Sequence, residues 1–393
     1  MKRKRWALIL LCALGIGVLS GCRGASVLSG YTEVDDIELV LSLGVDAGED
    51  GAVELTMCTG VGLDAEPPHV YSYKGDTLAS ALNEFQRSAA GKKTMFSHLE
   101  NFLIGESVAR AGIADYLDYV ERTMDIRLAT QLFIVKDGTA REMIQGASGE
   151  ESSATDMLEL LRQNVEELGI GHVYDFGEVA LRLEETGAAL VMAVRQTPGA
   201  ELPQTEEKSM ISPAGFAVLQ DGKLKAYVEE EAARGTALME SGVRFGDEKV
   251  RDLSGNEITL ELIGFSAKFS PVYRGSTLER IDVTAETESN VTELKGDARL
   301  SDESERAQIE AALAELMKKR IERAIGAAQE LKLDYIGIGG RIQRAAPVKY
   351  QKMDPDWETV FPDVEFRITS KAILKRTYDL EDPIPIDGTD KEE

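Results

Sequence analysis

A change of hydrophobic period in the last third of the chain sets narrow limits on the fold. Apolar and polar residues alternate through 257–274 and 277–294, which is typical of β-strands with one buried face. The next long segment, 302–332, has a helical period, and its apolar residues lie close to one stripe. These residues are Ile309, Leu313, Leu316, Ile321, Ile325, Ala328 and Leu331. Because 364–380 returns to a strand pattern, 251–380 is predicted to be an α+β domain with a long amphipathic helix.

The region 33–196 mixes the same two periods in shorter segments and is predicted to be an N-terminal α+β domain. It opens with a predicted hairpin, whose connection contains the turn pair Asp50-Gly51. The predicted strands are 37–46, 52–60, 99–105, 129–137 and 188–196, and the predicted helices are 77–91, 108–122, 139–146 and 154–168.

Composition divides the rest of the chain. The segment 197–210 is rich in Pro, Gly and polar residues and is predicted to be a linker. The segment 211–250 contains a second strand pair and a helix and is predicted to be a small middle domain. The end, 381–393, is predicted to be a disordered acidic tail. The expected fold is therefore α+β with three domains, in which helices pack on mixed or antiparallel sheets.

The N-terminus has the layout of a bacterial secretory signal. Four cations, Lys2 to Arg5, precede an apolar run that ends in Leu19-Ser20-Gly21-Cys22. This ending matches a lipobox, in which the Cys thiol is acylated and the chain is then cut in front of it. We therefore expect 1–21 to be a lipoprotein signal peptide and 22–32 to be a lipidated N-terminus and tether. The alternative is an uncleaved anchor helix that ends in a cysteine by chance.

Charge and cysteine content describe the mature chain further. Removal of four cations and no anions changes the formal net charge from −25 to −29. Such a body is repelled by anionic lipid heads and by nucleic acid, so no nucleic-acid partner is expected. Cys12 lies in the signal and Cys22 at the anchor, which leaves Cys58 without a partner for an intramolecular disulfide.

No pattern in the sequence indicates catalysis, a cofactor or a metal ion. The histidines His69, His98 and His172 stand singly, and no zinc or haem spacing occurs. The P-loop-like segment 88–94 fails because Gln86 stands where a phosphate-binding loop needs glycine. The acidic clusters, Asp35-Asp36, Glu229 to Glu231 and Asp354/Asp356, are read as solvated faces in so acidic a chain. The chain is therefore predicted not to be an enzyme.

Several segments together resemble one family. The segment 33–56 is similar to an opening pattern that ends in V-x-x-L-G-I-D, and 97–144 resembles H-x-x-x-x-x-I-G-E…L-D-x-x-x-R-x-x-x-I-R. The segment 214–235 resembles G-x-A-V-F-x-x-x-K-L-V-G…E-x-x-x-G, and 333–380 resembles D-x-x-G-x-G…P-x-x-W-x-x-x-F, here with Trp357 and Phe361. These segments span most of 33–380 in family order, behind a lipobox. The family is that of the Ger(x)C spore-germination lipoproteins, the C subunits of GerA-type nutrient germinant receptors.

The resemblance implies a non-catalytic subunit with three α+β domains. Its implied partners are the A and B membrane subunits of the receptor, and its implied location is the outer face of the cell or inner spore membrane, held there by lipid. Only one functional residue is carried over, the lipidated Cys22. The chain departs from the family after that residue, where Arg23 and Gly24 replace the usual Trp and Asp.

Two other functions remain open from the sequence. A solute-binding lipoprotein of a transporter, or another envelope binding module, fits the lipobox and the acidity equally well. An envelope hydrolase is the third possibility, without a catalytic motif to support it. The long helix also leaves two readings, a partner interface around 335–340 or simple packing of the helix on its own sheet.

Overall fold

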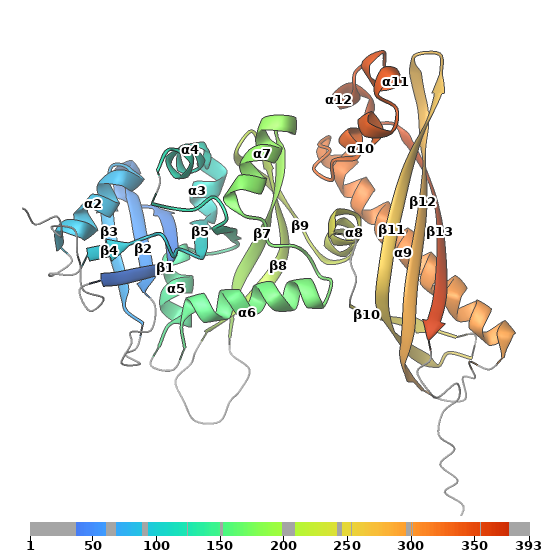
Figure 1. Ribbon diagram of the computed structural model, residues 1–393, viewed down its shortest axis with the longest axis horizontal. Helices are drawn as coiled ribbons and strands as arrows, with labels where there is room; N and C mark the ends of the chain where they lie inside the picture. The colour runs from blue at the N-terminus through green and yellow to red at the C-terminus, as the bar shows by residue number, and fades with distance from the viewer. Residues whose placement is uncertain are drawn as a thin grey trace, which may run out of the picture.

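The structure of the protein is a computed structural model, shown in Figure 1. It describes residues 37–59, 68–88, 93–123, 125–149, 152–198, 209–241, 246–252, 254–295, 300, 302–353 and 355–376. Two sheets, each with packed helices, lie at opposite ends of an elongated molecule (Figure 1). The predicted α+β fold with mixed and antiparallel sheets is confirmed.

The larger sheet has nine strands in the order β3-β2-β1-β5-β6-β7-β8-β9, with β4 paired to β1. Its first half comprises β1 (Ile37–Ala47), β2 (Val53–Thr59), β3 (Val70–Gly75), β4 (Lys93–Met95) and β5 (Asn101–Gly105). Its second half comprises β6 (Gln131–Val135), β7 (Ala188–Pro198), β8 (Ser209–Gln220) and β9 (Lys223–Val228). Strands β1, β5, β6 and β7 run parallel, and antiparallel pairs flank them on both sides.

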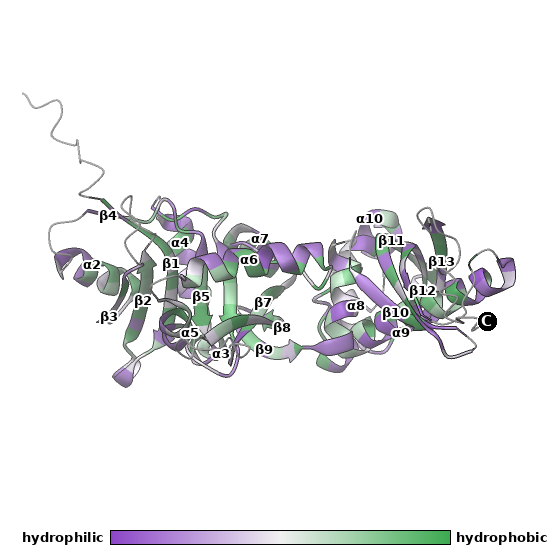
Figure 2. Ribbon diagram, turned by 90° about the horizontal axis from the view of Figure 1, so that it is seen from below, coloured by the Kyte–Doolittle hydropathy of each residue, from purple (hydrophilic) through white to green (hydrophobic). Residues whose placement is uncertain are grey.

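The helices around the larger sheet are α2 (Leu78–Ser88), α3 (Glu106–Ala111), α4 (Ala114–Arg122), α5 (Ala140–Ala147), α6 (Ala154–Glu167) and α7 (Phe176–Thr186). A 3-10 turn, Glu49–Gly51, joins β1 to β2. Helix α5 contacts both β1 and β8. The central strands are the most apolar part of this sheet (Figure 2), and β5 has five buried residues in succession, as strands covered on both faces do.

The predicted helix 108–122 is in fact two helices. The chain breaks at Gly112, whose φ of 138° is disfavoured for residues with a side chain, and α4 then starts in a new direction. The other predicted elements of this region are present, with their ends shifted by up to three residues. Strands β3 and β4 and helix α7 are present in the structure but were not predicted from the sequence.

The smaller sheet has the order β10-β11-β12-β13 and is covered by the long helix. Its strands are β10 (Asp247–Arg251), β11 (Glu257–Arg274), β12 (Thr277–Leu294) and β13 (Glu365–Arg376). Helix α9 (Glu303–Leu331) starts at Asp302, which caps the N–H groups of Ser304 and Glu305. Three short helices follow it, α10 (Ile338–Ala345), α11 (Pro347–Gln351) and α12 (Trp357–Val360). Packing of α9 against β13, and the burial of Tyr335, favour the simpler reading of the long helix.

The middle of the chain contributes strands to both sheets. Strands β7 and β8 pair as far as Pro198 and Ser209, so the predicted linker connects two neighbouring strands of one sheet. Strands β8 and β9 belong to the larger sheet, where β8 pairs with β7 and β9 pairs with β8. Helix α8 (Glu230–Ser241) packs mainly on α9, and β10 joins the smaller sheet. The domain boundaries themselves stay predictions.

Within the described residues, no helix combines the length and the apolar character that crossing a membrane requires. The predicted signal peptide, tether and acidic tail, including Cys22, lie outside the described residues.

Candidate functional site

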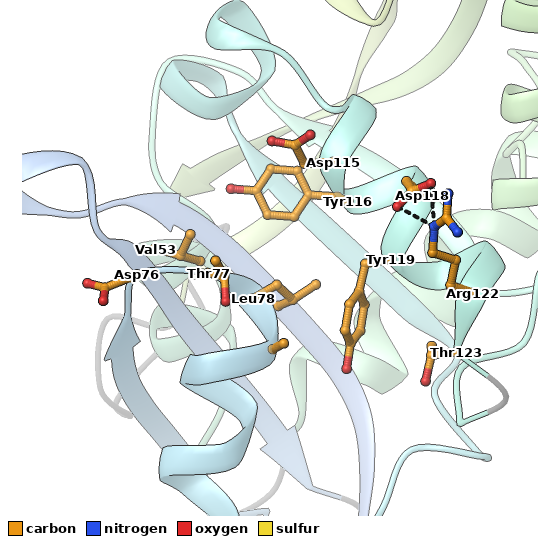
Figure 3. Close-up of a pocket in the computed structure, with 11 residues that line it drawn as sticks. Val53, Asp76, Thr77, Leu78, Asp115, Tyr116, Asp118, Tyr119, Arg122 and Thr123 are labelled. Carbon is orange, nitrogen blue, oxygen red and sulfur yellow. Dashed lines mark hydrogen bonds and ion pairs between the residues drawn. The ribbon is translucent and has the colours of Figure 1, made fainter.

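A pocket of about 590 Å³ lies at the end of the larger sheet where the C-termini of β1 and β3 are found (Figure 3). Val53 marks this end, because it pairs with Ala47 on one side and with Gly75 on the other. Strands β1 and β5 also finish here, and parallel sheets usually bind ligands beyond the carboxyl ends of their strands. The lining residues are Val53, Asp76, Thr77, Leu78, Ala79, Asp115, Tyr116, Asp118, Tyr119, Arg122 and Thr123.

The start of α2 and one side of α4 along its length form two walls of the pocket. On one wall, Thr77 and Ser80 exchange hydrogen bonds that begin α2, with the Thr77 N–H donating to Ser80 Oγ at 2.9 Å and the Ser80 N–H donating to Thr77 Oγ1 at 3.1 Å. On the other wall, the break at Gly112 directs α4 toward α2. Tyr116 and Tyr119 are three residues apart on α4 and therefore share one face. Figure 3 shows Tyr119 beside Leu78 of α2.

The charges of the pocket are unevenly compensated. Asp118 accepts from Arg122 Nε at 2.7 Å, and this hydrogen bond holds the pKa of Asp118 below its usual range. Asp76 and Asp115 are exposed, and neither has an ion pair with another described residue. Burial and the nearby charges of Asp115 and Asp46 raise the pKa of Tyr116, and burial raises that of Tyr119. Both phenols are therefore neutral at physiological pH.

This lining is suited to binding rather than to reaction. Its described side chains offer apolar and aromatic walls, carboxylates and one paired guanidinium, without a nucleophile beside a base. No group of three or more His, Cys, Asp and Glu that could hold a metal ion gathers within the described ranges.

The three histidines lie in three different places. The exposed side chain of His69 places Nδ1 3.4 Å from Oε1 of the buried Glu38, and His98 is exposed before β5. His172 lies between Glu166 and Glu178, at 3.6 Å and 3.4 Å. None of them lines the pocket.

The remaining candidates from the sequence have structural surroundings. Burial raises the pKa of the Cys58 thiol, and its Sγ is 3.6 Å from Ser148 Oγ. Glu229 pairs with Lys136 at 2.5 Å and with Arg195 at 2.9 Å, while Asp356 caps α12. Asp35, Asp36 and Asp354 lie outside the described residues.

The residues that carry the family resemblance in the first region hold elements together. The carboxylate of Asp46, at the end of β1, accepts from the N–H groups of Ala140 and Arg141, both at 2.9 Å, and so caps α5. Gly105 lies beside it, and an added Cβ there would displace the Asp46 carboxylate from this position. Glu106 accepts from the Asp137 N–H at 2.8 Å and links the ends of β5 and β6.

The corresponding residues of the segments 214–235 and 333–380 do the same. Gly235 lets α8 cross α9 closely, since an added Cβ would overlap the carbonyl oxygen of Arg320. Glu231 accepts from Arg320 Nε at 2.9 Å at the same crossing. Gly339 lies against the indole of Trp357, where a Cβ would come within 2.5 Å of Nε1. These motif residues are distributed over several joints and do not gather in one site.

A second polar cluster joins the two ends of the molecule at Glu240 of α8. Its carboxylate accepts from the Tyr174 hydroxyl at 3.0 Å and pairs with Arg182 of α7 at 2.5 Å. On its other side, Arg341 of α10 is 3.6 Å from Glu240 Oε1 and donates to the Met239 carbonyl oxygen. Sequence reasoning missed this cluster and the pocket, because each combines residues from segments that are far apart in the chain.

Comparison with known families finds two matches in chain order. Residues 30–196 match the family described as "Spore germination protein N-terminal domain", and residues 214–378 match "Spore germination B3/ GerAC like, C-terminal".

Two individual proteins are also similar to the chain. The "Putative spore germination protein YfkR" of Bacillus subtilis (strain 168) is 22% identical over 386 residues, which cover 94% of each chain. The crystal structure of the GerBC protein matches with a TM-score of 0.56 and 16% identity, over 84% of this chain and 96% of that one. This second likeness establishes a shared fold.

Proposed function

This chain belongs to the GerAC family of spore germination proteins, and from that premise we propose that it is the lipid-anchored, non-catalytic C subunit of a nutrient germinant receptor. The observation that carries the proposal is the order of the matches. Both family regions follow one another along the chain, and they follow a lipobox that ends at Cys22.

The anchor fixes where the subunit works. A diacylglyceryl group on Cys22 supplies two acyl chains, and two chains retain a protein on a membrane where one does so only marginally. The mature body carries a formal net charge of −29 and is repelled by anionic lipid heads. The subunit therefore stands off the outer face of the membrane and meets the A and B membrane subunits there.

The use of the motif residues supports a role through protein contacts. The motif residues hold helices and strands in place, as Asp46, Glu106, Gly235 and Gly339 show. The motifs therefore maintain a rigid body. A rigid, lipid-tethered body is suited to transmitting or organising contacts between membrane subunits.

The test replaces Cys22 in a spore-forming host. We expect Cys22→Ala to lose fatty-acid labelling and to impair nutrient-triggered germination, while sporulation stays normal. Cys12→Ala, which removes a cysteine outside the lipobox, is the matched control and should behave as wild type. Normal germination of Cys22→Ala spores would show that the lipid itself is not needed, whereas normal germination of spores that lack the gene, in a host without a redundant receptor, would sink the receptor assignment.

A second variant separates loss of the lipid from loss of the anchor. Unprocessed Cys22→Ala protein keeps its apolar segment and can stay on the membrane as an anchor helix. Replacing 1–22 by a cleavable secretory signal releases the body instead. Germination that fails in both variants shows that the lipid is needed, whereas rescue by the uncleaved segment shows that any anchor suffices.

A further inference from the structure

We propose that the pocket between α2 and α4 binds a small organic cation, an ammonium group carried on an apolar or aromatic body. This inference is independent of the receptor assignment, since it rests on the pocket's size, walls and charge alone.

The size and the position of the pocket fit a small ligand. Pockets that bind small molecules usually enclose about 300–1,000 Å³, and this one measures about 590 Å³. It lies beyond the ends of β1, β3 and β5, where the peptide groups of the sheet no longer pair with one another.

The walls favour a ligand with an apolar body. Leu78, Val53 and Ala79 supply aliphatic surface, and Leu78 is only 5% exposed. Tyr116 and Tyr119 add two neutral aromatic rings from one face of α4. The face of a tyrosine ring attracts a cation and also packs on apolar groups, so one ligand can use both properties.

The charge of the rim selects the sign of the ligand. Asp118 is neutralised by Arg122, which leaves the exposed carboxylates of Asp76 and Asp115 uncompensated by described residues. Both carboxylates lie at helix N-termini, and the partial positive charge of each helix N-terminus offsets about half of one carboxylate charge. The remaining charge is negative, so an anion is repelled and an ammonium group is attracted.

The experiment uses the full-length protein, purified in detergent, with 2-phenylethylammonium as the probe and isothermal titration calorimetry as the measurement. We expect saturable binding that is at least about ten-fold tighter than that of the neutral isostere 2-phenylethanol, with no detectable binding of 3-phenylpropionate. Equal binding of the ammonium and the alcohol would overturn the proposal, because the carboxylates would then have no role.

Variants locate the binding site. The double variant Asp76→Asn/Asp115→Asn should lose about ten-fold in affinity for the probe and keep its affinity for the alcohol. Asp247→Asn/Asp363→Asn, which removes the same charge from exposed positions elsewhere, controls for the general acidity of the protein and should change affinity less than about two-fold. An equal loss in both double variants would overturn the assignment of the site. Absence of saturable probe binding to the folded wild-type protein would overturn the proposal itself.

Discussion

The indole Nε1 of Trp357 donates a hydrogen bond to Asp334 Oδ2 at 2.9 Å, between residues 23 positions apart in the chain. The same carboxylate accepts from the N–H groups of Ile338 at 2.9 Å and Gly339 at 2.6 Å. Burial raises the pKa of Asp334, and these donors partly oppose that rise. One carboxylate thereby joins the segment after α9 to the start of α10 and to α12.

This joint gives the first prediction. Trp357→Phe keeps an aromatic ring but removes one donor, so we expect it to lower the free energy of unfolding by about 1–2 kcal/mol. Asp334→Ala leaves three donors without their acceptor and should cost about 3 kcal/mol or more. Urea unfolding at pH 7 measures both. Equal stability of Trp357→Phe and wild type would show that the indole N–H contributes nothing.

The crossing of α8 over α9 gives the second. Gly235→Ala forces a methyl group against the Arg320 carbonyl oxygen, and we expect a loss of about 2 kcal/mol or more, since the backbones must separate. Gly326→Ala on α9 is the matched control, because an added Cβ there meets nothing within 4 Å. It should raise stability by about 0.5–1 kcal/mol through helix propensity. The prediction fails if both variants shift the thermal midpoint in the same direction.

Glu240 provides the third prediction. Its side chain is only 5% exposed, and Glu240→Ala leaves Arg182 and Arg341 facing each other without the carboxylate between them. Removing one partner of a buried charge pair costs about 3 kcal/mol or more, and we expect a loss of that size in chemical unfolding. Glu84→Ala removes an exposed i,i+3 pair with Arg87 and should leave stability unchanged. A Glu240→Ala protein as stable as the Glu84→Ala protein would contradict the role assigned to this cluster.

The fourth prediction concerns pH and Glu106. Burial pushes the pKa of this carboxyl upward, but the Asp137 N–H and the Arg110 guanidinium outweigh it and hold the pKa below the ordinary 4.5. A lowered pKa in the folded state stabilises the protein above the unfolded pKa, and this stabilisation is lost as the pH falls through the folded value. Glu106→Gln should therefore destabilise the protein at pH 7 and much less near pH 3. A difference from wild type that stays constant from pH 7 to pH 3 would refute this linkage.

Local features were the predictable part of the fold. The β1–β2 connection forms where Asp50-Gly51 predicted it, because both residues adopt the left-handed backbone that such a pair favours. The apolar stripe likewise predicted α9, because the helical period can be recognised within that segment without any contact from the rest of the chain. Helix 108–122 was predicted as one element, but the structure breaks it at Gly112. The next residue, Ile113, donates its N–H to the carbonyl oxygen of Gly222, which lies outside the segment.

The candidate site was not predictable, because no contiguous motif encodes it. Leu78 follows β3, a strand that the sequence reading lacked, whereas Tyr116 and Tyr119 depend on the new direction that α4 takes. The only functional residue predicted from the sequence, Cys22, stays a prediction. The motifs pointed to the family correctly. Their residues, such as Asp46 and Asp334, hold secondary-structure elements together and do not form a binding site, because residues with a structural role occur in sequence motifs as readily as residues that bind a ligand.

The parallel pairing of β12 with β13 has a consequence for the timing of synthesis. Arg280 lies opposite Glu365, so these neighbours are made 85 residues apart, with the whole of α9 between them. A chain that emerges from its N-terminus has all the strands of the larger sheet once Val228 is out, whereas β12 keeps an unpaired edge until almost the last described residue is made. Pairings this distant form slowly. A chain cut short before β13 would therefore have a complete larger sheet and an unpaired edge on β12. Such a chain is more prone to proteolysis and aggregation than the complete protein.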